Sequence, residues 1–514
     1  MVSKVQSASL LGLRSLNIQV EAQVIGALRR FSIVGLPDSA LKEAKDRVRC
    51  ALENSGFSFP HSEVIVSLAP ASVPKNGSGF DLAIAVSILA ATGRIPLESL
   101  QRKMFLAELS LDGSIKPVHG VLAAAELLSK QKDSSLFVAP EIASAAAAFV
   151  DIEVFAVRSL QELVAVLNGE ASLEAEKVPE MQTAEIIISP DFGDVVGQAS
   201  AKRAFEISAA GAHNLLMLGP PGVGKSMLAK RMLSIMPPLS LSESLEVAKI
   251  KNSNYSSDYR TDAILTRKRP FRSPHHTIST AGLIGGGSFP QPGEISLAHR
   301  GVLFLDELVE IRKDALESLR EPLENKTVEI SRAKQRVSFP SDFILIAAAN
   351  PCSRGNCPKF EPGANKFTLC ECTALEQKRY RSKLSGPLVD RIDMQVWVGQ
   401  VPLRELAQTE IKDNPTSSMR ERVAQARQLQ RARFKTDRKL NSVMTPREVK
   451  RYCILDQQSF ELLENASKKF SISARSYTRL LKVARTIADL DASPQICLPH
   501  LSEALGYRLG WENI

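Results

Sequence analysis

A glycine-rich segment at residues 219–226 carries the most specific chemical signal in this chain. Its sequence, GPPGVGKS, matches the G-x-x-x-x-G-K-[ST] pattern of phosphate-binding loops in full. Apolar residues 215–218 precede the loop as an expected strand, and residues 227–233 follow it with a helical pattern. Backbone N–H groups of the loop and the helix N-terminus would bind phosphates. The expected contacts to ATP comprise Gly219, Pro220, Pro221, Gly222, Val223, Gly224, Lys225, Ser226 and Met227.

Two side chains of this loop and two carboxylates further along the chain would complete the chemistry. Lys225 would reach the β- and γ-phosphates, and the hydroxyl of Ser226 would bind Mg²⁺. Residues 302–307 read VLFLDE, so a buried strand would end with Asp306 near Mg²⁺ and Glu307 beside the attacking water. A glycine loop alone can be accidental, and an Asp-Glu pair alone is common on surfaces. Together, in this order and spacing, they predict an ATPase site.

Four of the seven cysteines fall within residues 352–372: Cys352, Cys357, Cys370 and Cys372. In a reducing compartment this clustering favours a metal over disulfides. The spacing, C-x4-C-x12-C-x-C, lies outside the common zinc-ribbon patterns, yet four thiolates in one loop suit a tetrahedral Zn²⁺. We therefore expect a structural zinc ion, and a loop of free, oxidisable thiols is the alternative.

Length and composition narrow the class of protein. A chain of 514 residues predicts roughly three domains. Its content of 44% hydrophobic and 24% charged residues is ordinary for a soluble globular protein. The sequence shows no apolar run of membrane-spanning length and no secretory signal, so we expect a cytoplasmic protein. The net charge of +9 resides in the middle and the tail, which suits a polyanionic partner, although a well-solvated helical tail explains it equally.

The order of patterns predicts the organisation of the chain. Residues 1–170 alternate β-like and helical stretches, which indicates an α/β domain. A polar, glutamate-rich linker follows at 171–190. The ATPase core occupies 191–400 and includes the cysteine-rich loop 352–372. A basic helical domain forms 401–514, with helices expected near 420–433 and at 474–490.

Seven further segments have long, specific sequences: 33–38, 76–82, 108–113, 272–276, 292–299, 386–393 and 483–490. With them, nearly the whole chain resembles the ComM/YifB competence family of magnesium-chelatase-subunit-like AAA+ ATPases. The resemblance implies a homo-hexameric motor that uses ATP and Mg²⁺ on single-stranded and branched duplex DNA. It further implies a helicase that drives branch migration while incoming DNA is integrated during natural transformation, in contact with other recombination proteins.

The resemblance also implies a fold. An N-terminal domain similar to Lon proteases would precede an AAA+ P-loop core with a parallel sheet and a C-terminal helical lid. Lon-type proteases use a Ser–Lys dyad, but the matching positions here hold Gly79 and Leu122, which can be neither nucleophile nor base. Ser78 is adjacent but out of register. We therefore expect a non-proteolytic scaffold.

The resemblance assigns sensor roles to two residues of the ATPase. Asn350 would be the sensor-1 residue beside the γ-phosphate, and the alternative is an asparagine that merely starts the turn before Pro351. Ser473 would open a lid helix in which Arg475 is the sensor-2 residue. Arg479 lies one turn further on the same face and competes for this role.

Arg391 resembles the arginine finger of the family and would act on a neighbouring subunit's nucleotide. A planar guanidinium suits the spread charge of the transition state, and losing such a finger costs about 10³–10⁵ in rate. The alternative is a salt bridge within the same domain to Asp390 or Asp393.

Residues 328–339 alternate around a basic tip and predict a hairpin. Arg332, Lys334 and Arg336 would project into the pore of a ring and contact DNA phosphates, and a solvated hairpin is the alternative. Glycine-rich residues 281–287 would form a second, flexible pore loop. The adjacent His275 and His276 diverge, which makes them a poor metal pair and favours a structural or phosphate-contacting role.

Two other functions share the same core. One is a metal-chelatase motor subunit that inserts Mg²⁺ into a porphyrin, and the other is a DNA-binding scaffold whose assembly ATP regulates. The Lon-like front domain, the basic tail and the cysteine loop argue against the chelatase. DNA-stimulated ATP hydrolysis separates the motor from the chelatase, and unchanged DNA processing by a Glu307→Gln variant would favour the scaffold.

Overall fold

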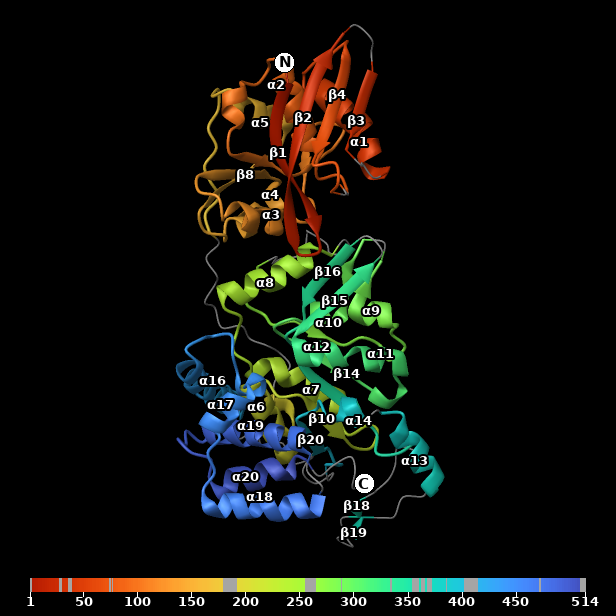
Figure 1. Ribbon diagram of the computed structural model, residues 1–514, viewed down its shortest axis with the longest axis vertical. Helices are drawn as coiled ribbons and strands as arrows, with labels where there is room; N and C mark the ends of the chain where they lie inside the picture. The colour runs from red at the N-terminus through yellow and green to blue at the C-terminus, as the bar shows by residue number, and fades with distance from the viewer. Residues whose placement is uncertain are drawn as a thin grey trace.

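The computed structural model of the chain describes residues 2–26, 30–35, 39–73, 75, 77–178, 192–254, 265–287, 289–332, 335–353, 360–361, 366–367, 372–384, 386–401, 415–470 and 473–508. The molecule is elongated, with an N-terminal α/β part at one end and a second α/β part in the middle (Figure 1). Helices of the C-terminal segment pack beside this middle part. Within the described ranges, every helix is too short or too polar to cross a membrane.

A seven-stranded mixed sheet forms the N-terminal part, in the order β3-β4-β2-β1-β5-β8-β9. Its strands are β1 (Val2–Leu11), β2 (Arg14–Ile25), β3 (Arg30–Val34), β4 (Glu63–Ala69), β5 (Lys103–Phe105), β8 (Ser134–Val138) and β9 (Ile152–Ala156). Strands β1 and β2 form a long antiparallel hairpin, paired as far as Leu11 and Arg14. Strands β5, β8 and β9 run parallel to one another. A small separate hairpin joins β6 (Glu108–Leu109) to β7 (Ile115–Lys116).

Helices cover both faces of this sheet. Because successive side chains of a strand point to opposite faces, Phe137 joins one apolar cluster while Leu136 and Val138 join another. The first cluster includes α1, α2 and α5, and the second includes α3 and α4. The α/β domain expected from alternating patterns is therefore present. Its helices are α1 (Ser39–Asn54), α2 (Asp81–Ala91), η1 (Leu97–Leu100), α3 (Val121–Leu128), α4 (Pro140–Ala146) and α5 (Leu160–Leu167).

A five-stranded parallel sheet forms the middle part, in the order β11-β14-β17-β10-β20. The strands are β11 (Phe271–Arg272), β14 (Val302–Leu305), β17 (Ile344–Ala349), β10 (Leu215–Leu218) and β20 (Met394–Trp397). Strands β10, β14 and β17 are buried at every residue, as expected for parallel strands covered on both faces. All carboxyl ends meet at one edge, where the loops that follow β10, β14 and β17 converge.

The two faces of this sheet have different neighbours. Leu215 and Met217 face a cluster with α6, α7 and the C-terminal helices, whereas Leu216 and Leu218 face α10, α11 and the β15–β16 hairpin. The remaining elements are η2 (Phe192–Asp194), α6 (Ala199–Gly211), α7 (Lys225–Ile235), α8 (Leu241–Asn252), α9 (Thr280–Ile284), β12 (Gly285–Gly286), β13 (Gln291–Pro292), α10 (Glu294–Leu297), η3 (Leu308–Glu310), α11 (Lys313–Ser318), α12 (Arg320–Asn325), β15 (Thr327–Arg332), β16 (Gln335–Pro340), β18 (Phe360–Glu361), β19 (Lys366–Phe367), α13 (Ala374–Ser382) and α14 (Gly386–Val389).

One sequence expectation for this part is wrong. Residues 281–284 belong to helix α9, and residues 285–286 form β12, which pairs with β13. Ser279 caps α9 by accepting a hydrogen bond from the N–H of Gly282 at 3.1 Å. The glycine content of residues 281–287 predicts a flexible loop, but the hydrogen bond from Gly282 to the capping Ser279 stabilises a helix there instead.

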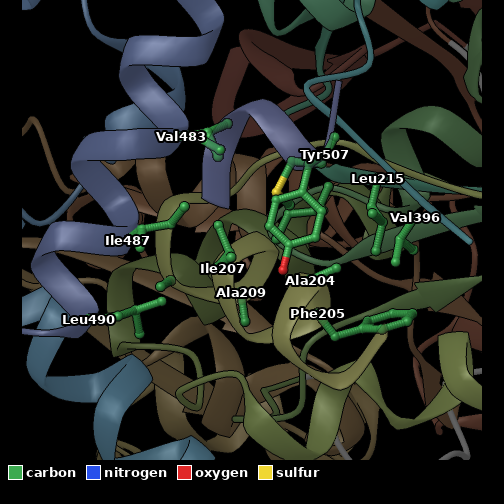
Figure 2. Close-up of a cluster of buried hydrophobic side chains, with 14 of the residues drawn as sticks. Ala204, Phe205, Ile207, Ala209, Leu215, Val396, Val483, Ile487, Leu490 and Tyr507 are labelled. Carbon is green, nitrogen blue, oxygen red and sulfur yellow. The ribbon is translucent and has the colours of Figure 1, made fainter. Parts of the chain in front are cut away.

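The C-terminal helices share a hydrophobic core with the middle part. They are α16 (Pro415–Phe434), η4 (Asn441–Val443), α17 (Pro446–Tyr452), α18 (Gln457–Phe470), α19 (Ala474–Leu490) and α20 (Leu498–Gly506). Figure 2 shows Val483 and Ile487 of α19 beside Ala204 and Ile207 of α6. Helix α19 spans the expected residues, and Ser473 caps it as expected. Because this core is continuous, the helical segment and the parallel sheet are packed as one unit.

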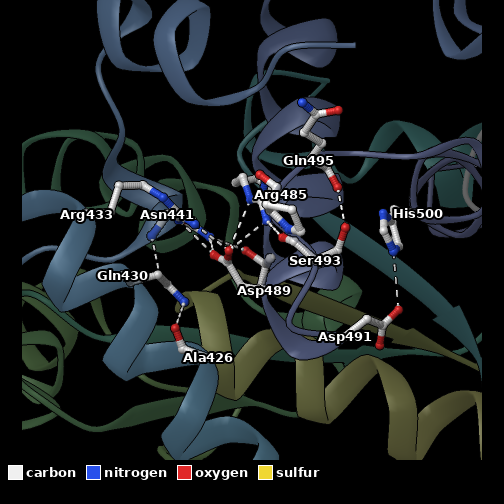
Figure 3. A network of polar contacts seen from close by, with 12 residues as sticks. Ala426, Gln430, Arg433, Asn441, Arg485, Asp489, Asp491, Ser493, Gln495 and His500 are labelled. Atoms are coloured by element: carbon white, nitrogen blue, oxygen red, sulfur yellow. Dashed lines mark hydrogen bonds and ion pairs between the residues drawn. The ribbon is translucent and has the colours of Figure 1, made fainter. Parts of the chain in front are cut away.

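A buried carboxylate organises the polar side of these helices (Figure 3). The side chain of Asp489 has no exposed surface and binds the guanidinium groups of Arg433 and Arg485. Asn441 Nδ2 also donates to Asp489, at 2.8 Å. One carboxylate therefore ties α16, the segment before α17, and α19 together.

Candidate ATPase site

The glycine loop connects β10 to α7 in a conformation that requires glycine. Gly222 and Gly224 have φ angles of +79° and +90°, in the left-handed region that side chains disfavour. A Cβ on Gly219 would lie 2.2 Å from the carbonyl oxygen of Val398. The three glycines of the motif thus allow the loop to turn tightly and to start α7 at Lys225.

The Lys225 ammonium lies inside the loop. Its Nζ donates to the carbonyl oxygens of Gly219 at 2.7 Å and Pro220 at 2.8 Å, and to Oδ1 of Asn350 at 3.1 Å. Burial lowers the pKa of Lys225, and the charges of Asp306 and Glu307 partly oppose this shift. A concentrated positive charge at the N-terminus of a helix suits the β- and γ-phosphates of a nucleotide.

The expected magnesium ligands are in direct contact. The Ser226 hydroxyl donates to Oδ2 of Asp306 at 2.5 Å, which joins the start of α7 to the residue after β14. Oδ1 of the same carboxylate accepts the N–H of Glu307 at 2.9 Å. A hydroxyl and a carboxylate at this distance fit the hard oxygen shell that Mg²⁺ prefers, alongside waters and phosphate oxygens.

Glu307 has a partner that sequence reasoning missed. Its Oε2 lies 3.0 Å from Nδ1 of His276, and both side chains are partly exposed. His276 follows β11, the neighbour of β14, so parallel pairing brings the two strand ends together. The ring centroids of His275 and His276 lie 4.1 Å apart, and Nδ1 of His275 lies 2.9 Å from the hydroxyl oxygen of Thr277. Nothing in the sequence pattern marks His276 and Glu307 as partners.

Asn350 lies beside Lys225 of the glycine loop. It follows β17, between β14 and β10, and its side chain accepts the hydrogen bond from Lys225. Its carbonyl oxygen accepts the hydroxyl of Tyr380 of α13 at 3.1 Å. The glycine loop, the two carboxylates and the asparagine therefore meet at one edge of the sheet.

The two expected trans-acting or lid arginines meet at a different place. Arg391 is buried and forms an ion pair with Glu324 of α12 at 2.7 Å, a partner that the sequence alternatives did not include. Arg475 binds the same Oε1 of Glu324 at 3.2 Å. Its competitor Arg479 approaches Asp393 at 3.5 Å. A single carboxylate thus holds both candidate arginines within one chain.

The hairpin expected at residues 328–339 is present as β15 and β16, paired from Thr327 and Pro340 to Arg332 and Gln335. Arg336 is exposed and forms an ion pair with Glu329 on the opposite strand. Lys334 and the side chain of Arg332 lie outside the described residues.

The cysteine cluster is described in part. Cys352 and Cys372 are buried and pack against each other, and the hydroxyl of Ser353 lies 3.8 Å from the sulfur of Cys372. Cys357 and Cys370 lie outside the described residues. Among the side chains that the structure does describe, no group of three or more His, Cys, Asp or Glu residues is arranged to hold a metal ion.

Family models of magnesium chelatase cover most of the chain. The model "Magnesium chelatase, subunit ChlI" matches residues 191–406, which include the glycine loop, Asp306, Glu307, Asn350 and Arg391. The model "Subunit ChlI of Mg-chelatase" matches residues 20–142, and "Magnesium chelatase, subunit ChlI C-terminal" matches residues 413–508. The three matches follow the three parts of the fold.

Two relatives are similar to the chain over nearly their full length, and a third is similar over part of it. The YifB protein of Salmonella typhimurium is 39% identical over 506 residues, 98% of this chain and 96% of the relative. The competence protein ComM of Haemophilus influenzae is 39% identical over 510 residues, 98% of this chain and 97% of the relative. Lon protease 2 of Bacillus subtilis is 28% identical over 219 residues, 35% of this chain and 38% of the relative, in keeping with the Lon-like N-terminal domain. The chain therefore belongs to the ComM/YifB family of magnesium-chelatase-subunit-like AAA+ ATPases.

Proposed function

We propose that ATP hydrolysis at this site drives DNA through a hexameric ring, and that this motor promotes branch migration of incoming DNA during natural transformation. The observation that carries the proposal is the assembled site. Lys225, Ser226, Asp306, Glu307 and Asn350 converge on one sheet edge, each in a position suited to phosphoryl transfer. The similarity to a competence protein over 98% of this chain supports the biological setting.

The DNA contacts of this motor are Arg332, Lys334 and Arg336. The exposed Arg336 supports this assignment, because its guanidinium reaches solvent while Val337 of the same strand is buried. Glu329 neutralises Arg336 when no DNA is bound, so a phosphate must replace a carboxylate there. Such exchanges are independent of base sequence and weaken with salt.

Ring formation gives Arg391 a second partner. In a single chain, Glu324 binds both Arg391 and Arg475. We propose that Arg391 reaches the neighbouring subunit's γ-phosphate and Arg475 its own nucleotide when ATP is bound between subunits. Both arginines would then exchange Glu324 for phosphate oxygens, which links assembly to nucleotide binding.

The N-terminal domain serves as a scaffold without protease activity in this proposal. Gly79 and Leu122 offer no nucleophile and no base at the dyad positions. The N–H of Leu122 instead donates to Oδ1 of Asn252, a residue of the ATPase core. We assign the domain to residues 1–170, the linker to 171–190, the core to 191–400 and the lid to 401–514, and we place the protein in the cytoplasm.

A structural zinc ion bound by Cys352, Cys357, Cys370 and Cys372 is a further part of the proposal. The burial of Cys352 against Cys372 supports it, because two thiolates of a tetrahedral site must lie close together. Metal analysis of the purified chain should give about one zinc per subunit. A Cys372→Ser variant that retains the same zinc content would contradict the assignment.

The decisive test uses a labelled four-way junction with ATP and the full chain. We expect the wild type to convert the junction and the Lys225→Ala variant not to do so. We also expect ATP turnover of the wild type to rise when DNA is added. A Glu307→Gln variant should bind ATP and DNA but convert no junction. If ATP turnover ignores DNA, or if the protein remains monomeric with ATP and DNA present, the motor is refuted and a chelatase-type or scaffold function takes its place.

A further inference from the structure

Within the described residues, the N-terminal domain contacts the ATPase core at two separate places (Figure 1). At the first place, Asn252 at the end of α8 contacts the start of α3. Its Oδ1 accepts the N–H groups of Gly120 at 3.0 Å and Leu122 at 3.3 Å. Lys249, one turn earlier, forms an ion pair with Glu126 of α3 at 2.6 Å. These contacts fix the base of the N-terminal domain on the core.

The second contact is the tip of the β1–β2 hairpin. Leu11 and Leu13 flank the turn and pack against the apolar cluster that contains Val337 and Ile330 of the β15–β16 hairpin. Gly12 forms the turn with a φ of +63°, and a Cβ added to it would lie 2.1 Å from Cγ1 of Val337. The two hairpins are therefore in van der Waals contact, and no side chain fits between them at this point.

The geometry makes the β1–β2 hairpin a stiff connection. Strand β1 is paired along its whole length with residues 14–23 of β2, and β1 and β2 lie in the middle of the seven-stranded sheet. Val5 and Val20, which are partners across the hairpin, are almost fully buried. A displacement of the sheet is therefore carried to the tip, since closely packed interiors yield little.

Val337 is adjacent to the proposed DNA contact Arg336. Successive side chains of β16 point to opposite sides, so Val337 faces the tip while Arg336 faces solvent. A shift of Val337 moves Arg336 with it, because one peptide unit separates them.

We propose that the turn formed by Leu11, Gly12 and Leu13 is a positioning element for the β15–β16 hairpin. Through this turn, the N-terminal domain sets the position of the proposed DNA contact Arg336 relative to the ATPase core. This inference rests on the proposed function, since it gives the N-terminal scaffold a role in DNA engagement by that same motor. Gly12 acts through Val337 and does not touch DNA.

The test compares Gly12→Ala with Gly26→Ala. Gly26 ends the same hairpin with a φ of +65°, and an added Cβ there would meet no atom within 4 Å. The two variants therefore share the backbone cost of a left-handed alanine, but only one pushes on Val337. The readouts are ATP turnover without DNA and the single-stranded DNA concentration that gives half-maximal stimulation.

Gly12→Ala should leave the DNA-free rate unchanged and raise the half-maximal DNA concentration by about twofold or more, as for other coupled contacts. Gly26→Ala should match the wild type in both. Adding Val337→Ala to Gly12→Ala removes the clashing methyl groups and should return the half-maximal concentration to that of Val337→Ala alone. Equal behaviour of the two glycine variants, or failure of this rescue, overturns the inference while the motor stands.

A second measurement tests the contact without DNA. A double-mutant cycle on thermal unfolding midpoints should show coupling between positions 12 and 337, and additive midpoints would overturn the contact. If the cycle shows this coupling but ATP turnover of the wild type is not stimulated by DNA, the proposed function fails. The inference then fails with it, even though the two hairpins are in contact.

Discussion

The contact between His276 and Glu307 yields a prediction about the resting ATPase. In the proposed mechanism Glu307 accepts a hydrogen bond from the attacking water, whereas in this structure its Oε2 lies 3.0 Å from Nδ1 of His276. The two side chains are 35% and 53% exposed, so their contact contributes at most about 1 kcal/mol. Removing His276 should therefore raise the fraction of free Glu307, and with it DNA-free ATP turnover, by up to about fivefold.

Steady-state phosphate release by the full chain, with and without single-stranded DNA, measures this effect. His276→Ala should raise the rate without DNA and reduce the ratio by which DNA stimulates it. His275→Ala is the matched control, because His275 contacts Thr277 instead of the glutamate. A rate below that of the wild type would mean that His276 assists the reaction, and an equal rise in the control would mean that the ring pair acts as a unit. Either result refutes the reasoning.

Three further outcomes follow from other contacts. Lys225→Ala should lower the turnover number by at least about 10²-fold, since a preorganised charge at the phosphates is lost, and phosphate release measures it. Asp489→Ala leaves two arginines without their buried carboxylate and should cost about 3–5 kcal/mol in a urea titration, and a cost below 1 kcal/mol would show that solvent replaces the carboxylate. Burial opposes ionisation of Glu246, but hydrogen bonds from His299 and Arg300 lower its pKa to about 2. Because this pKa is depressed, ionised Glu246 should add to the free energy of unfolding above about pH 4.5, and this contribution should be lost as the pH falls towards 2. In urea titrations at several pH values, Glu246→Gln should therefore show a weaker dependence of the free energy of unfolding on pH over this range.

The parts of the site that could be predicted from the sequence are those with strict local requirements. Phosphate binding needs glycines at fixed spacing before a lysine, and parallel strands need apolar runs that end at one edge. Ser226 and Asp306 therefore lie in contact, as expected, although they are far apart in the sequence. The bounds of α19 could be predicted from the sequence as well. Its apolar residues recur with the period of a helix, and Ser473 is a capping residue directly before it.

The contacts that escaped prediction depend on tertiary packing between elements with no shared pattern. Glu324 lies in a short helix with nothing to mark it, yet it holds Arg391 and Arg475 together. The partner of Glu307 could be found only after β11 was placed beside β14. Gly12 reads as an ordinary hairpin turn, and its close approach to Val337 appears only when two domains are docked.

The same apolar cluster connects these separate findings. Leu303 and Leu305 of β14 belong to it, and that strand ends at the carboxylates of the ATPase site. Val337 and Phe339 of the β15–β16 hairpin belong to it as well, and Leu11 and Leu13 pack against it from the N-terminal domain. A close-packed cluster transmits displacement because its side chains cannot move independently. We expect a shift of the end of β14 on nucleotide binding to be shared among the elements of this cluster, which include the β15–β16 hairpin. The stiffness of the N-terminal tip favours movement of the hairpin over movement of the tip.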